Sequence, residues 1–193
     1  MSHRLCVHMD DCRAVTQLSE YLGNFFTETV KKGPPVIVCI GTDRSTGDSL
    51  GPLVGWRLST LLSGWDLLII GTLDNPVHAE NLSEVMKQLT AKEKYCPILA
   101  VDACLGQVSP IGSVVIEKTP LYPGTGLKKK LPPVGDLSIT GIVNLSGFME
   151  QQLLHTTRLS LVMRLAKIIS DSTYLAIRRN YSYLSNSCIH SNL

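Results

Sequence analysis

Residues 36–52 read VIVCIGTDRSTGDSLGP, and this stretch decides the fold. Its first five residues, 36–40, form a continuous apolar run, which is typical of a strand buried on both faces of a parallel sheet. A polar loop with several glycines follows over 41–51, and Pro52 is placed where helices often carry a proline, in the first turn. A buried strand, a loop and a helix in this order are typical of the first half of a β-α-β unit.

The same alternation continues along the chain. Further buried strands are predicted over 67–70 and 98–101, the second ending at Asp102, and helices are predicted over 52–62 and 81–93. Strands separated by helices at this spacing indicate parallel strands that are joined by crossover connections. The expected fold class is therefore α/β.

The segments on either side of this region have other patterns. We expect an N-terminal helix over 12–32, a strand that could lie at a sheet edge over 112–118, a long irregular excursion over 119–133, and a short strand or turn over 137–143. Residues 145–177 have the apolar spacing of one long helix, so His155 is expected to be a structural residue of that helix.

Composition narrows the class of protein. The 193 residues are 44% hydrophobic and 18% charged with a net charge of +2, which suits a single domain over 1–193, with its core at about 34–170 and a frayed tail from about 182. The basic run at 128–130 is short and lacks interleaved aromatic residues, so no nucleic-acid partner is expected.

No run approaches the roughly 20 apolar residues of a membrane span, and no signal peptide is recognisable, so no membrane association is expected. The six cysteines have neither CxxC pairs nor zinc-type spacing, which favours a reduced, cytoplasmic protein.

Ionisable residues gather in the loops that follow the predicted parallel strands. Asp43 and Asp48 follow the first strand, Asp74 and His78 follow the second, and Asp102 ends the third. Ligands of open parallel sheets bind outside the carboxyl ends of the strands, so we expect these side chains along one edge. The first loop contains neither GxGxxG nor Gly-Lys-Ser/Thr, and it therefore matches neither a dinucleotide-binding fingerprint nor a Walker loop.

Asp48 and Asp102 are the main candidates for chemistry. A carboxylate at the end of a buried strand loses hydration unless it is paired or binds a ligand, and two carboxylates at one site raise the pKa of one of them. Such a pair can supply both an acid and a base, or it can bind a hard metal ion. Structural alternatives stay open, because Asp48 could cap the following helix and Asp102 could accept hydrogen bonds from loop amides.

His78 and Cys104 are further candidates at this edge. His78 could be a general base or a substrate-binding group, although a histidine at a helix start is also a common surface residue. Cys104 could act as a nucleophile only with a base beside it, and His78 is the one histidine expected nearby.

Four motifs in order resemble the YyaC-type sporulation proteins of spore-forming bacteria. They are VIVCIGTDRSTGDSLGP at 36–52, GTLDNPVHAENL at 71–82, AVDACLG at 100–106 and GTGLKKKLPPVGDLSITGIVN at 124–144. YyaC-type proteins are similar to the germination protease that degrades small acid-soluble spore proteins, and both resemble the hydrogenase-maturation endopeptidases. The resemblance covers residues from about 34 to 170. It implies a three-layer α/β/α sandwich with a mostly parallel sheet, of the phosphorylase/hydrolase-like kind.

The resemblance also implies roles for individual residues. Asp48 in GDSLGP matches an aspartate implicated in catalysis in the germination protease, and Asp102 matches its second functional aspartate. In the hydrogenase-maturation enzymes a later histidine joins the equivalent acidic pair around a metal. Residues 133–141 contain no histidine, and Asp136 or Ser138 lies in that neighbourhood instead, so we expect no metal and no other cofactor.

The expected function is therefore that of a sporulation-linked peptidase. Asp48 and Asp102 would activate water for attack on a peptide bond of a protein substrate, such as a spore protein. Supporting or substrate-binding roles are expected for Asp43, His78, Asp136 and Ser138. The alternatives are a non-catalytic binding or regulatory module, a metal-dependent endopeptidase, and an enzyme based on Cys104.

Overall fold

The computed structural model describes residues 4–29, 33–92, 96–106, 109–123, 131–147 and 150–187. Its strands are β1 (Arg4–His8), β2 (Val36–Cys39), β3 (Ile69–Ile70), β4 (Ile98–Gly106), β5 (Ser113–Glu117) and β6 (Leu137–Leu145). Its helices are α1 (Ala14–Thr29), α2 (Leu50–Leu61), α3 (Leu82–Lys92), α4 (Glu150–His155) and α5 (Leu159–Ser187), with a short 3-10 turn, η2 (Gly47–Ser49), before α2. The basic run at 128–130 lies outside the described residues.

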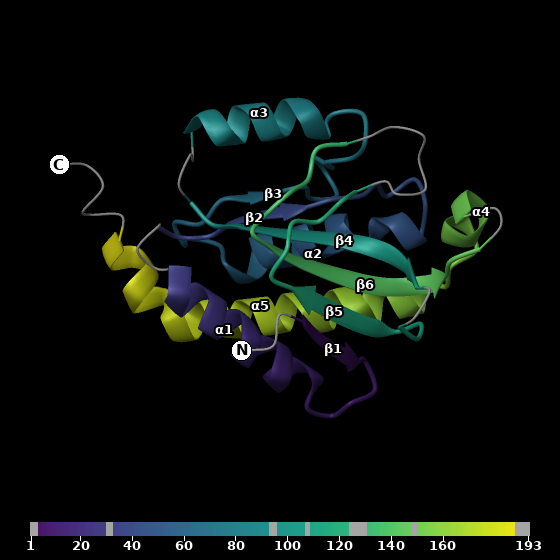
Figure 1. The fold of residues 1–193 in the computed structure, drawn as a ribbon, viewed down its shortest axis with the longest axis horizontal. Coiled ribbons are helices and arrows are strands. Elements are labelled where there is room, and N and C mark those ends of the chain that lie inside the picture. Colours follow the sequence, from purple (N-terminus) through teal and green to yellow (C-terminus); the bar gives the residue numbers. More distant parts are fainter. Residues whose placement is uncertain are drawn as a thin grey trace.

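The strands form one sheet in the order β1-β5-β6-β4-β2-β3 (Figure 1). The four strands β6, β4, β2 and β3 run parallel to one another, whereas β5 is antiparallel to both β1 and β6. The prediction of an α/β fold with a mostly parallel sheet is therefore confirmed.

Helices cover both faces of the sheet. On one face, α1, α2 and α5 enclose a core that includes Leu22, Phe26 and Leu165, because each helix turns an apolar stripe toward the strands. On the other face, Leu82 and Leu89 of α3 contribute to a second core. Figure 1 shows α3 above the sheet and α1 and α5 below it, so the predicted three-layer α/β/α arrangement is also confirmed.

The N-terminal segment contains a strand that the sequence analysis missed. β1 pairs with β5 from Arg4 opposite Glu117 to His8 opposite Ser113, and it occupies the edge of the sheet. Only Val7 of β1 is buried, so the apolar pattern of this segment is weak. Because β1 lies outside β5, the suggested edge position of β5 is wrong.

β6 and the segment after it also differ from the prediction. β6 is a nine-residue strand between β4 and β5, not a short strand or turn. The predicted single helix over 145–177 is divided between the end of β6, α4 and α5. The side-chain amide of Asn144 donates to the Leu153 carbonyl at 3.0 Å, which ties α4 to the end of β6.

The remaining predicted elements are present with shifted boundaries. β3 is only two residues long and half-buried, because it pairs with β2 alone at the edge of the sheet. α2 begins at Leu50, so Pro52 lies in its first turn as expected. No helix in the described part of the chain is both long and apolar enough to cross a membrane.

Candidate functional site

Asp102 lies at the point on β4 where β2 ends. β4 pairs with β2 only as far as Val101, opposite Cys39, but it pairs with β6 on to Gly106. The prediction that β4 ends at Asp102 is therefore wrong, because β6 extends the pairing. Asp102 is the first residue of β4 beyond the end of β2, and Thr140 of β6 is its neighbour in the register.

Asp48 comes to this end of β2 from the loop that follows the strand. The Thr42 N–H donates to the Asp48 carbonyl at 3.1 Å, which folds the loop back over the strand end. Gly41 has a φ of 137°, and a Cβ at this position would collide with the Asp48 carbonyl oxygen. Gly51 lies equally close to the Ile40 carbonyl. The loop therefore needs glycine at both positions to bring Asp48 down onto the sheet.

The helix-capping role that the sequence left open for Asp48 is not the one observed. Asp48 lies inside the turn η2, and Ser49 occupies the N-cap position of α2. The Ser49 hydroxyl donates to the Thr46 carbonyl at 2.7 Å. Asp48 caps neither η2 nor α2, so its carboxyl group needs another explanation.

The electrostatic surroundings of the two carboxyl groups differ. Burial raises the pKa of Asp102 well above its usual range, and the negative charge of Asp48 raises it further, against an opposing hydrogen bond from the Ala103 N–H at 2.8 Å. Burial also raises the pKa of Asp48, but the Thr42 N–H and the positive charges of His78 and His155 oppose that rise. The rise in pKa caused by burial is therefore opposed by more groups at Asp48 than at Asp102.

His78 lies within electrostatic reach of Asp48, at the turn before α3. The His78 N–H donates to Asn81 Oδ1 at 2.8 Å, and the Glu80 N–H donates to His78 Nδ1 at 3.3 Å. Because Nδ1 accepts a hydrogen bond, the neutral ring carries its proton on Nε2. The structure therefore brings His78 near Asp48, with Nδ1 of its ring bonded to the Glu80 N–H.

His155 also lies near Asp48, and the sequence analysis did not predict it as a site residue. It is the last residue of α4, which lies beyond the tips of β4 and β6 in Figure 1. The apolar spacing over 145–177 concealed the end of α4. The polar residues Thr156, Thr157 and Arg158, which interrupt that spacing, were the local signal that could have revealed it.

Asp136 and Ser138 do not join the pair. The Asp136 N–H donates to the Ile98 carbonyl at 2.8 Å, and its Oδ2 accepts from the Ile98 N–H at 2.9 Å. Asp136 therefore lies at the amino end of β4, and its expected place in the site is wrong because the parallel register puts it at the opposite edge. The buried Ser138 hydroxyl donates to the Glu117 carbonyl at 3.4 Å, which explains it as a bond between β6 and β5.

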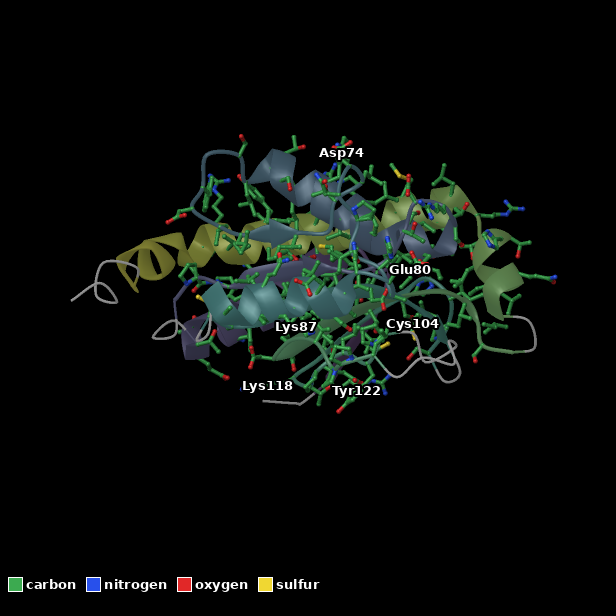
Figure 2. The ribbon with its side chains drawn as sticks, turned by 90° about the horizontal axis from the view of Figure 1, so that it is seen from above. Asp74, Glu80, Lys87, Cys104, Lys118 and Tyr122 are labelled. Carbon is green, nitrogen blue, oxygen red and sulfur yellow. The ribbon has the colours of Figure 1, made fainter. Side chains whose placement is uncertain are left out.

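The other candidates lie on the surrounding strands and loops. Asp43 and Asp74 are exposed on the loops after β2 and β3. Cys104 is two residues beyond Asp102, so strand alternation puts both side chains on the same face of the sheet, and its thiol donates to the Leu105 carbonyl at 3.4 Å. Figure 2, which looks onto α3, shows Glu80 just before the start of that helix.

The residues at this edge do not fit a metal centre. Within the described ranges, no group of three or more His, Cys, Asp or Glu side chains is arranged to hold a metal ion. The three-ligand centre that the hydrogenase-maturation resemblance implies therefore has no counterpart in this part of the chain.

Comparison with known proteins places the chain in a family. Residues 6–172 match the family described as protein of unknown function (DUF1256). The chain belongs to this family. It is 46% identical over 172 residues to the uncharacterized protein YyaC of Bacillus subtilis (strain 168), covering 89% of this chain and 82% of that protein. The resemblance to YyaC-type proteins is therefore confirmed.

Among solved structures, the chain is similar to the NiFe hydrogenase maturation protease HycI from Thermococcus kodakarensis KOD1. The TM-score is 0.49 and the identity 21%, and the match covers 79% of this chain and 98% of that chain.

Proposed function

We propose that this protein is a peptidase in which Asp48 and Asp102 act together on a water molecule. The observation that carries the proposal is that two carboxyl groups, one on β4 just beyond the end of β2 and one on the loop after β2, lie near enough for the charge of one to act on the other. Two half-buried carboxyl groups at one site destabilise the folded state, because both lose hydration and because they repel each other when both are ionised. An arrangement that destabilises the fold is more typical of a functional site than of a structural contact.

The surroundings of the pair suggest which residue is the acid and which is the base. Asp102 is the more strongly desolvated carboxyl group and has the charge of Asp48 beside it, so it retains its proton. Asp48 receives the Thr42 N–H and the influence of two imidazoles, so it is the ionised partner. Two identical side chains with divergent pKa values are the usual basis of general acid–base catalysis by a carboxyl pair.

The reaction follows from this division of roles. The Asp48 carboxylate accepts a proton from water, and the water oxygen attacks the carbonyl carbon of the peptide bond. The carboxyl proton of Asp102 hydrogen-bonds to the carbonyl oxygen and stabilises the negative charge that develops there. When the C–N bond of the tetrahedral intermediate breaks, Asp48 gives its proton to the leaving nitrogen. A carboxylic acid and an amine are released, and both aspartates return to their initial states.

The resemblance to YyaC-type proteins also suggests a biological setting. The resemblance of four motifs to YyaC-type sporulation proteins, and through them to the germination protease, supports a cytoplasmic role in sporulation. The substrate would then be a protein, such as a spore protein, cleaved at an accessible peptide bond.

A proteome-derived peptide library tests the proposed activity without knowledge of the substrate. The full-length protein is incubated with the library, and new amino termini are identified by mass spectrometry. Asp48→Asn and Asp102→Asn should remove the new termini. Asp66→Asn should preserve them, because Asp66 is exposed before β3, at the opposite edge of the sheet. No new termini with the wild-type protein, or undiminished cleavage by both site variants, would favour the binding module.

A further inference from the structure

The last turn of α4 is fastened to the end of β6. The side-chain amide of Asn144 donates to the Leu153 carbonyl at 3.0 Å and to the Thr157 hydroxyl at 3.4 Å. The Thr157 hydroxyl in turn donates to the Leu153 carbonyl at 2.8 Å, and Thr157 is buried. These three groups define the position of α4 because each bonds to the other two.

The same turn of α4 also rests on the loop that carries Asp48. A Cβ at Gly47 would lie 2.8 Å from Leu154 Cδ2 and 2.9 Å from the Leu154 carbonyl oxygen, so the two backbones approach closely. Gly47 immediately precedes Asp48, and Leu154 immediately precedes His155. Because Gly47 and Leu154 are in close contact, Asp48 and His155 lie in the same neighbourhood.

Several charged groups of the elements packed against η2 pair with other residues or are already part of the site. In α2, Arg57 pairs with Asp171 at 2.8 Å, and in α5, Lys167 pairs with the same carboxylate. Arg164 of α5 pairs with Asp10, and β4 contributes Asp102. Within the described residues, the cations that act on Asp48 are therefore the imidazoles of His78 and His155.

We propose that His155 is a positioning residue for Asp48, held beside it by the contacts of α4 with Asn144 and Gly47. This inference rests on the proposed function, because Asp48 is the base of that mechanism. His155 is exposed, while Asp48 is half-buried. The protonated ring stabilises the Asp48 carboxylate and extends to lower pH the range over which Asp48 can accept a proton.

The direct test is the titration of the Asp48 carboxyl group, followed by carbon NMR of the aspartate side chains in full-length protein. Asp48→Asn identifies the signal. In His155→Gln the titration should move to higher pH, and His155→Lys should return it toward or below that of the wild type, because lysine restores a positive charge. His8→Gln is the matched control, since His8 lies on β1 beside Asp10. An Asp48 titration that is the same in His155→Gln and His8→Gln would overturn the proposal.

Activity provides the second readout. If the protein cleaves peptides, His155→Gln should lower kcat/KM on the acidic side of the pH profile by about twofold to fivefold, which is the effect of an exposed charge pair, and His155→Lys should restore it. Asn144→Ala, which releases α4, should lower it in the same direction. If the acidic limb of the pH profile of kcat/KM is unchanged in His155→Gln, the result counts against the proposal. Because the NMR titration needs no substrate, it can fail or succeed independently of the peptidase assignment.

Discussion

Asp48 and Asp102 lie together where β2 ends, and the negative charge of Asp48 raises the pKa of Asp102 beyond the effect of burial. The two residues come from separate motifs, one in the glycine-containing loop after β2 and one in the interior of β4. The proximity arises because β4 extends beyond the last residue of β2. The loop that follows β2 can therefore fold over this extended part of β4.

The first prediction concerns catalysis. Asp48→Asn and Asp102→Asn should each lower kcat/KM on a peptide from the library by about 10²–10⁴-fold, because Asn keeps the shape of the side chain but cannot transfer a proton. Steady-state kinetics with the peptide measures the loss, and Asp66→Asn should stay within about twofold of the wild type on the same scale. A loss below tenfold in both site variants would mean that the aspartates position a substrate rather than move protons.

The second prediction concerns stability and pH. Folding raises the pKa of Asp102, so the stability that this group contributes is fully present below its unfolded pKa of about 3.9 and is lost as pH rises through the folded pKa. The amide side chain introduced by Asp102→Asn has no acidic proton to lose. At neutral pH the free energy of unfolding of this variant should therefore exceed that of the wild type by about 0.5–2 kcal/mol.

Urea unfolding between about pH 4 and pH 8 measures this difference. The gap between the variant and the wild type should widen as pH rises, whereas Asp66→Asn should follow the wild type throughout. A variant that is less stable at every pH would show that the Asp102 carboxylate is well satisfied in the fold and that the proposed strain is absent.

The third prediction concerns the loop that carries Asp48. Gly51→Ala should lower the free energy of unfolding by about 1–3 kcal/mol or more, because its Cβ would meet the Ile40 carbonyl and the backbone would have to move. Gly147→Ala is the matched control, since nothing lies within 4 Å of a Cβ there. Thermal or urea unfolding of both variants decides the matter, and equal effects would mean that the loop has room to relax.

The fourth prediction concerns the ion pair between α2 and α5. Although burial acts in the opposite direction, hydrogen bonds and charges from Arg57 and Lys167 lower the pKa of Asp171. The stability that Asp171 contributes is therefore present above its unfolded pKa and is lost as pH falls through the folded pKa. Asp171→Asn should lower the free energy of unfolding at neutral pH by about 1–2 kcal/mol, with partial exposure limiting the effect.

A second ion pair provides the comparison for Asp171. Arg4 and Glu117 meet at 2.9 Å with both side chains largely exposed, so Glu117→Gln should cost less than about 1 kcal/mol. Urea unfolding at neutral pH and again at about pH 3 measures both variants, and the deficit of Asp171→Asn should shrink at the lower pH. A deficit that is the same at both values would indicate lost packing rather than a lost charge interaction.

Local sequence was sufficient for β2, the loop that follows it and α2. The apolar run ending at Ile40, the loop with Asp48 and the helix that begins beside Pro52 can be predicted because each depends on neighbouring residues. A continuous apolar run is buried on both faces in whichever order the strands lie. The expectation that Asp48 and Asp102 would share one edge followed from the rule for parallel sheets.

Tertiary structure decided the rest of the site. Asp136 belongs to the opposite edge because β6 pairs in parallel with β4 and starts beside Ile98, a register that no local pattern contains. β1 exists because β5 provides it with hydrogen bonds, although its own sequence buries only Val7. His155 comes to Asp48 because Asn144 and Gly47 hold the last turn of α4, contacts that the apolar spacing over 145–177 does not contain. Hydrophobic periodicity reports which side of an element is buried, whereas strand neighbours, register and helix breaks depend on contacts between residues that are distant in the chain.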